Sequence, residues 1–117
     1  MSATELTLTV DGTSFAIQLE DNATTAALAE LLPLELSMTE LNGNEKYADL
    51  PESLPTDSTR VGSIEAGDVM LFGDDCLVVF YKSFDTSYSY TRIGHIDNAD
   101  ELAAALGSGN VSATLSR

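Results

Sequence analysis

The chain has 117 residues, enough for one domain with its own core, and we expect a single domain over residues 1–117. Its 19 Asp and Glu against five Lys and Arg give a formal net charge of −14, so we expect neither nucleic acid nor an anionic membrane surface as a partner. With one cysteine the chain can form no internal disulfide, which fits a reducing compartment. We see no signal-peptide pattern and no apolar run of the ~20 residues that a membrane-spanning helix needs, so we expect the chain to be cytoplasmic.

The first predicted elements are a β-hairpin and a helix. In "TELTLTV" (4–10) and "TSFAIQL" (13–19) apolar residues alternate with polar ones, as in strands that are buried on one face. Asp11 and Gly12 between them predict a type I′ turn, because both residues accept positive φ. The period then changes to that of a helix in "DNATTAALAELLP", for which Asn22 or a following Thr is a suitable N-cap.

The middle of the chain predicts strands around an irregular loop. Alternation returns over residues 34–41 and ends at the turn signal Asn42-Gly43. The stretch "YADLPESLPTDSTR" (47–60) contains two prolines and is interpreted as an irregular surface loop with short extended pieces. Binding sites are often built on loops of this kind. Extended chain follows in "VGSIEAGDVMLF", and the almost wholly apolar "CLVVFY" (76–81) is predicted as a central strand buried on both faces.

The end of the chain predicts two more strands and a second helix. The strands are "TSYSYTRIGHI" (86–96) and "NVSATLS" (110–116). Between them, "NADELAAAL" is predicted as a short helix that Asn98 caps, with Glu101 in the capping-box position. About eight strands with two short helices, mostly joined as hairpins, predict a mainly β fold: a closed or nearly closed antiparallel barrel with helices over its ends.

Three segments carry a likeness to a known family: "LNGNEKYADLPESLP", "AGDVMLFGDDCLVVFYKSF" and "TSYSYTRIGHI". With them the chain closely resembles, from Leu6 to Leu115, the bacterial and archaeal cyclophilin-like fold proteins, small domains largely without assigned function. The resemblance implies a cyclophilin-like closed antiparallel β-barrel of about eight strands with two short helices. It transfers no activity, because one fold hosts many functions.

The candidate site residues centre on one predicted strand. Tyr88, Tyr90 and Arg92 lie at positions i, i+2 and i+4, so on extended chain they project from one face, two aromatic rings beside one cation. Such a group could hold a proline ring or a carboxylate, or the arginine could simply stack on the tyrosines. Tyr47 and Arg60 flank the proline-containing loop and are added as ligand-binding candidates.

Two other reactive residue types favour a structural interpretation. On a regular strand His95 would face the opposite side from Arg92, and a lone histidine beside a helix start is commonly a hydrogen-bonded surface residue. Cys76 opens an apolar strand, where a small thiol usually serves packing, and no oxyanion-hole signature accompanies a Cys–His couple. We see no metal-ligand spacing, phosphate loop or dinucleotide fingerprint, so neither a metal nor a cofactor is expected.

Three functions stay open at this point. The leading hypothesis is a non-covalent binding module for a peptide segment or a small-molecule ligand. The runner-up is a weak peptidyl-prolyl cis-trans isomerase with Arg92 as catalytic residue, weakening the double-bond character of the imide. Against it, the Phe-His-Arg type of motif found in true cyclophilins is missing, since His95 follows Arg92 by three positions and no Phe precedes them. The third is an accessory domain of an amide-processing assembly, because related barrels resemble parts of such assemblies.

Overall fold

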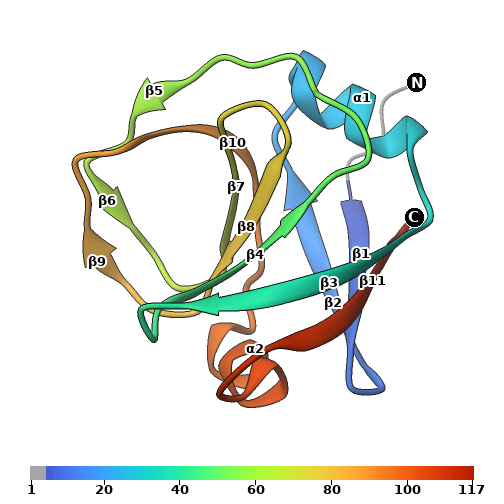
Figure 1. Cartoon of the computed structure of the whole chain (residues 1–117), viewed down its shortest axis with the longest axis vertical. Helices are drawn as coiled ribbons and strands as arrows, with labels where there is room; N and C mark the ends of the chain where they lie inside the picture. Colours follow the sequence, from blue (N-terminus) through green and yellow to red (C-terminus); the bar gives the residue numbers. More distant parts are fainter. Residues whose placement is uncertain (1–4) are drawn as a thin grey trace.

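Eight antiparallel strands close into a barrel in the computed structural model, which describes residues 5–117 (Figure 1). The barrel strands are β1 (Glu5–Val10), β2 (Thr13–Leu19), β3 (Leu34–Leu41), β4 (Glu45–Asp49), β7 (Asp68–Phe72), β8 (Cys76–Phe80), β10 (Ser89–His95) and β11 (Val111–Ser116). Each strand pairs with the next in the order β2-β1-β11-β3-β4-β8-β7-β10, and β10 pairs with β2 to close the barrel. The predicted fold class is confirmed. Residues 1–4 of the expected domain, including Thr4 of its first predicted strand, lie outside the described residues.

Local turn chemistry joins the strands as the sequence predicts. Asp11 and Gly12 have φ values of 50° and 78°, the left-handed conformation that a type I′ turn requires at both positions. Asn42 and Gly43 join β3 to β4 with φ values of 56° and 70°. These turns fix the pairing of both hairpins and so decide which residues face the interior.

Three two-residue strands lie outside the barrel. β5 (Thr59–Arg60) pairs with the start of β10, while β6 (Ser63–Ile64) and β9 (Phe84–Asp85) pair with each other as a ribbon, which stands at the left of the barrel in Figure 1. The loop predicted from residue 47 contains short extended pieces, as expected, but residues 47–49 belong to barrel strand β4 and the loop begins after them. The two buried, charged residues that open this strand concealed its alternation from the sequence analysis.

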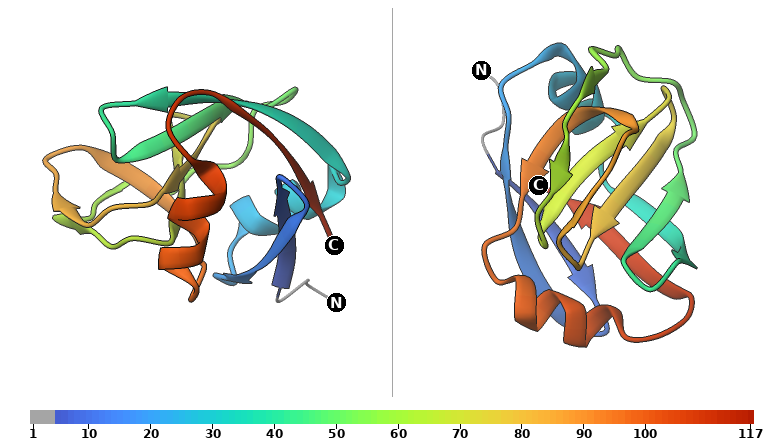
Figure 2. Two further views of the ribbon diagram at one scale, coloured as in Figure 1. Left: turned by 90° about the horizontal axis from the view of Figure 1, so that it is seen from below. Right: turned by 90° about the vertical axis from the view of Figure 1, so that its left-hand side faces the viewer.

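The two helices lie at opposite ends of the molecule (Figure 2). In α1 (Ala23–Glu30) the Asn22 side chain accepts a 2.8 Å hydrogen bond from the Thr25 amide, confirming the predicted cap. Asn98 is the N-cap residue of α2 (Ala99–Leu106), as predicted, but its side chain makes no cap hydrogen bond. Its φ and ψ of −86° and 59° depart from the extended values of −150° and 173° at Asn22, which aim the side chain at the helix amides. Of the helices described, none is long and apolar enough to cross a membrane.

The barrel interior is filled by alternate residues of the strands, closed off by apolar residues of both helices. We call this set the barrel core; its largest fully buried members include Leu6, Leu8, Ile17, Leu28, Met38, Leu71, Leu77 and Ile93. Such burial is the main favourable term in folding, about 1.5–3 kcal/mol for each large apolar side chain.

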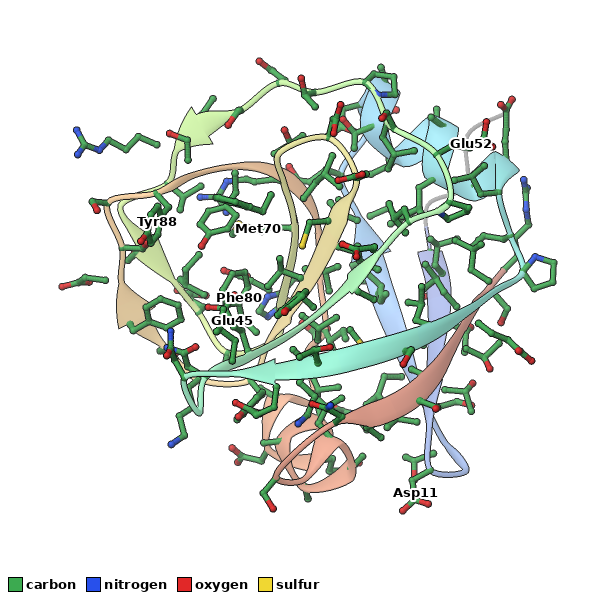
Figure 3. The ribbon with its side chains drawn as sticks, in the orientation of Figure 1. Asp11, Glu45, Glu52, Met70, Phe80 and Tyr88 are labelled. Atoms are coloured by element: carbon green, nitrogen blue, oxygen red, sulfur yellow. The ribbon has the colours of Figure 1, made fainter. Side chains whose placement is uncertain are left out.

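A second apolar group covers the outer face of β7, β8 and β10. This outer cluster consists of Ile64, Met70, Val78, Phe80 and Tyr90, with Phe84 of β9 packed against it. It lies between the barrel wall and the β6–β9 ribbon, on the side where Figure 3 labels Met70 and Phe80. Strand β8 is therefore buried on both faces, as its uninterrupted apolar sequence predicts.

Candidate functional site

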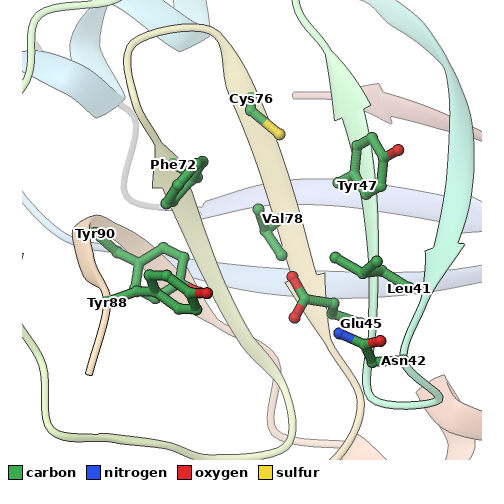
Figure 4. A pocket seen from close by; sticks show the side chains of 9 residues that line it. All are labelled: Leu41, Asn42, Glu45, Tyr47, Phe72, Cys76, Val78, Tyr88 and Tyr90. Carbon is green, nitrogen blue, oxygen red and sulfur yellow. The ribbon is translucent and has the colours of Figure 1, made fainter. Parts of the chain in front are cut away.

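A pocket of about 390 Å³ opens on the outer face of the barrel, beside the outer cluster (Figure 4). Strand β8 crosses the middle of the pocket, with the β3–β4 hairpin on one side and β7 and the start of β10 on the other. We call it the outer pocket. Its lining residues are Leu41, Asn42, Glu45, Tyr47, Phe72, Cys76, Val78, Tyr88 and Tyr90.

Four of these residues are aromatic, and three of them form a connected group. The Phe72 ring centroid lies 6.1 Å from that of Tyr88, nearly edge-on, and 5.7 Å from that of Tyr90. Tyr90 in turn meets Phe80 of the outer cluster at 5.5 Å, with the rings at 89°. Such edge-to-face contacts stabilise aromatic groups beyond their burial and hold the rings in fixed orientations. One side of the pocket is thus a preformed aromatic wall.

The mouth of the pocket is apolar. Leu41 is 40% exposed, Phe72 46% and Tyr88 63%, and these are the exposed large hydrophobic side chains within residues 5–117. All three line the outer pocket. Isolated exposed apolar residues are ordinary, but their concentration around one concavity is typical of a ligand-binding surface.

Glu45 places a carboxyl group in this apolar surrounding. Its residue is only 9% exposed, and Figure 4 shows the carboxyl group directed into the pocket, toward the side of Val78. Within the described part of the chain, the carboxylate has neither an ion-pair partner nor a hydrogen-bond donor. Burial, and secondly the nearby Glu40 charge, raise the pKa of Glu45 above its ordinary value.

The neighbouring Lys46 cannot neutralise Glu45, because it faces the other side of β4. Its fully buried ammonium lies 3.0 Å from Glu40 Oε1, donates to the Gly109 carbonyl, and sits 5.5 Å from the centre of the Tyr81 ring. The Tyr81 hydroxyl donates a 2.6 Å hydrogen bond to the same Glu40 oxygen. Burial, with the Glu40 bond and charge, raises the pKa of Tyr81 to about 12. The charge of Lys46 is thus committed to this network.

Cys76 lines the outer pocket but lacks the surroundings of a nucleophile. Burial, followed by the negative charges of Asp49, Asp75 and Glu45, raises the pKa of its thiol to about 11. Because the thiolate is the reactive form, the thiol is unreactive near neutral pH. His95 is also far from Cys76. His95 pairs with Asp68 at one end of β7 and Cys76 with Phe72 at the other end, and these two ends are four residues, or roughly 13 Å, apart.

His95 is held in a local structural role. Its Nδ1 lies 2.8 Å from Asp68 Oδ1, while the other oxygen of Asp68 accepts a bond from the Glu65 amide. A regular strand would place His95 and Arg92 on different faces, but β10 is irregular, because its register shifts between Arg92 and Gly94. As a result His95, which pairs with Asp68, lies on the same outer face as Arg92, which pairs with Met70.

The structure brings together some of the residues that the sequence singled out and separates others. Tyr47 of β4 lines the outer pocket together with Tyr88 and Tyr90, which lie just before and within β10. Arg92 shares the outward direction of Tyr90 but is exposed and lies outside the pocket lining. Arg60 is exposed on β5, opposite Ser89, and likewise does not line the pocket.

Sequence reasoning did not identify Leu41, Asn42, Glu45 or Phe72 as residues of the site. The one available signal was the spacing of Glu45 and Tyr47, which at i and i+2 on a strand face the same side. No group of three or more His, Cys, Asp or Glu within residues 5–117 is arranged to hold a metal ion.

Comparison with known proteins agrees with the fold. The model of the Cyclophilin-like family matches residues 8–116 of the chain. A hypothetical protein from Archaeoglobus fulgidus, known from its solution structure, superimposes with a TM-score of 0.57 at 16% identity, over 97% of this chain and 94% of that one. At this identity the likeness concerns the fold alone. A search of curated proteins finds no matching sequence.

Proposed function

The chain belongs to the Cyclophilin-like family, and we propose that the outer pocket of its barrel binds a small organic ligand non-covalently. The observation that carries the proposal is a preformed concavity of about 390 Å³ with an aromatic wall, an apolar mouth and one inward carboxyl group. Small-molecule sites are commonly about 300–1,000 Å³, mostly apolar, with a few polar groups that fix orientation. The outer pocket has each of these properties.

Binding rather than catalysis is favoured by the state of the reactive groups. The thiol of Cys76 has a pKa of about 11, and the imidazole of His95 is engaged with Asp68 away from the pocket. A prolyl isomerase would need Arg92 beside Tyr88 and Tyr90 to donate to the imide, yet Arg92 is not among the lining residues. An accessory role in a larger assembly would call for an extended apolar face. The large hydrophobic residues that are exposed within residues 5–117 instead line the outer pocket.

The proposal is tested by an NMR screen of ¹⁵N-labelled protein against a panel of water-soluble aromatic molecules, both neutral and charged. We expect shifts of backbone amides to cluster on the strands around the pocket, at residues such as Glu45, Tyr47, Val78 and Tyr90. Shifts scattered over the barrel, or none from any panel member, would contradict a ligand site here.

The single cysteine offers a matched control for the same screen. Alkylating Cys76 with iodoacetamide at raised pH, where more of its thiolate forms and displaces iodide, places an added acetamide group in the pocket. We expect the alkylated protein to lose the shifts, while a Cys76→Ala protein treated with the same reagent keeps them. Binding that survives alkylation would place the ligand elsewhere.

A further inference from the structure

The carboxyl group of Glu45 is the feature of the outer pocket that apolar binding does not explain. Within residues 5–117 the Glu45 residue is nine-tenths buried, and its carboxyl group has no counter-ion. Burying a carboxylate without a partner is costly, and natural structures usually pair such a group. The nearest candidate on its own strand, Lys46, faces the barrel interior and is bound to Glu40. The pocket walls therefore supply no positive charge to balance Glu45.

The remaining walls suit a cation as well. The lining contains no Lys or Arg, but it presents the rings of Tyr47, Phe72, Tyr88 and Tyr90. The negative faces of aromatic rings attract ammonium and guanidinium groups, and the attraction grows when the ion is desolvated. A carboxylate beside aromatic rings thus provides both a counter-charge and a favourable apolar surrounding for an organic cation.

We propose that the ligand of the outer pocket is a small organic cation, an amine with an apolar or aromatic body, whose N–H groups donate to the Glu45 carboxylate. This assignment rests on the proposed function, since it names the chemistry of the ligand for that same pocket. An anionic ligand would meet Glu45 and a net charge of −14, and a purely apolar one would bury the carboxyl group further without pairing it.

The raised pKa of Glu45 agrees with an acid poised for such a ligand. In the empty pocket, burial and secondly the charge of Glu40 raise this pKa. A bound cation would act in the opposite direction and lower it, because a nearby opposite charge favours the ionised form. The other ionisable groups that line the pocket with Glu45 are the phenols of Tyr47 (β4), Tyr88 (before β10) and Tyr90 (β10) and the Cys76 thiol (β8), which are neutral in their protonated forms.

The test compares three probes with one phenyl ring each by NMR titration near neutral pH: 2-phenylethylammonium, the neutral 2-phenylethanol and the anionic 3-phenylpropanoate. We expect the ammonium to bind about 10- to 100-fold more tightly than the alcohol, the value of a charge-assisted hydrogen bond, and the carboxylate to bind weakest. This comparison uses the unaltered protein and does not depend on the folding of any variant.

Two matched variants locate the charge that selects the cation. Glu45→Gln is nearly isosteric and should abolish the preference for ammonium over alcohol. Glu35→Gln removes the same unit of charge from an exposed position of β3, outside the pocket lining, and should keep the preference. A preference that persists in Glu45→Gln would assign it to the general negative charge of the protein and overturn the inference.

The outcomes separate the two proposals. Equal binding of ammonium and alcohol in the outer pocket would contradict the cationic ligand but leave the binding site standing. Absence of binding by all three probes would contradict the site itself. A lysine side chain shares the ammonium chemistry, so N-acetyl-lysinamide is titrated in parallel. Tighter binding of this compound than of 2-phenylethylammonium would assign the pocket to a peptide lysine, against the small amine proposed here.

Discussion

Glu40 and Glu45 flank the same β3–β4 turn, yet their surroundings move their pKa values in opposite directions. Burial raises the pKa of Glu45, and the nearby Glu40 charge adds to the rise. Burial also opposes the ionisation of Glu40, but hydrogen bonds from Tyr81, Lys46 and the Gly43 amide outweigh it and lower its pKa. One carboxyl group is committed to the protein's own cation. The other is left without one.

The raised pKa of Glu45 has a consequence for stability. A carboxyl group with a raised folded-state pKa contributes most below its ordinary pKa, and that contribution is lost as the pH rises through the folded value. Glu45→Gln removes the titration. As the pH rises from about 4 to 7, we therefore expect the free energy of unfolding of Glu45→Gln to increase relative to that of the parent protein, by roughly 1.4 kcal/mol for each unit by which the pKa of Glu45 is raised. Denaturant titrations across this range measure the difference. If the difference in free energy of unfolding between Glu45→Gln and the parent is constant with pH, or if Glu35→Gln shows the same change with pH, the environment assigned to Glu45 is contradicted.

The contribution of Glu40 to stability changes with pH in the opposite direction from that of Glu45. Because its pKa is lowered, its contribution is present above the ordinary pKa and is lost as the pH falls through the folded value. Glu40→Gln leaves the buried Lys46 ammonium without its counter-charge, and we expect a loss on the order of 3 kcal/mol at neutral pH. The double variant Glu40→Gln/Lys46→Met should recover much of this loss. A loss no larger than that of Glu35→Gln would show that the pair does not stabilise the barrel.

At the level of elements, the barrel is closed by β10 passing close to β2. Gly94 lies at this seam, opposite Leu19, and a Cβ there would stand 2.4 Å from the Gln18 carbonyl oxygen and 2.8 Å from Ile17 Cγ2. Because the nearest atom belongs to the backbone, relief requires the strands to separate. The absence of a side chain at residue 94 is therefore a condition for closure.

Gly94→Ala is expected to destabilise the protein by about 1–3 kcal/mol or more, the usual cost of forcing extra volume into a packed site. Ser37→Thr, which adds one methyl group at an exposed position of barrel strand β3, serves as the control and should change stability by less than about 0.5 kcal/mol. Thermal and denaturant unfolding compare the two. Equal stability of Gly94→Ala and the parent would mean that the seam is looser than the structure describes.

The elements with their own local signals were the ones that the sequence could predict. The Asp11-Gly12 turn and the apolar strand β8 can each be predicted from a few consecutive residues, and the structure contains both. Strand β4 and the α2 cap depend on tertiary surroundings: Lys46 looks like a surface residue until the contact with Glu40 is known. Tertiary contacts of this kind override local pattern.

The candidate site was predictable only in part for the same reason. Alternation told which face Tyr88, Tyr90 and Arg92 share, but not where on that face a concavity would end. The pocket reaches Tyr90 and stops short of Arg92. Glu45 was missed because its burial comes from packing across the outer face of the sheet, which no pattern within β4 reveals.

For the whole molecule, the charge and the pocket are separate sources of selectivity. A net charge of −14 attracts every cation at long range, and salt screens that attraction. The contact with Glu45 is local and desolvated, so it should discriminate between ligands of equal charge by their shape. The central claim is therefore one of position: an organic cation should lie in the outer pocket with its nitrogen beside Glu45.

Intermolecular nuclear Overhauser effects test that position most directly. With 2-phenylethylammonium bound, we predict contacts from the ligand ring to the Val78 methyl groups and the Tyr88 and Tyr90 rings, and from the ligand methylene beside the nitrogen to the Glu45 side chain. All of them should disappear when Cys76 is alkylated. Contacts to any other face of the barrel, or a ligand nitrogen far from Glu45, would contradict the account.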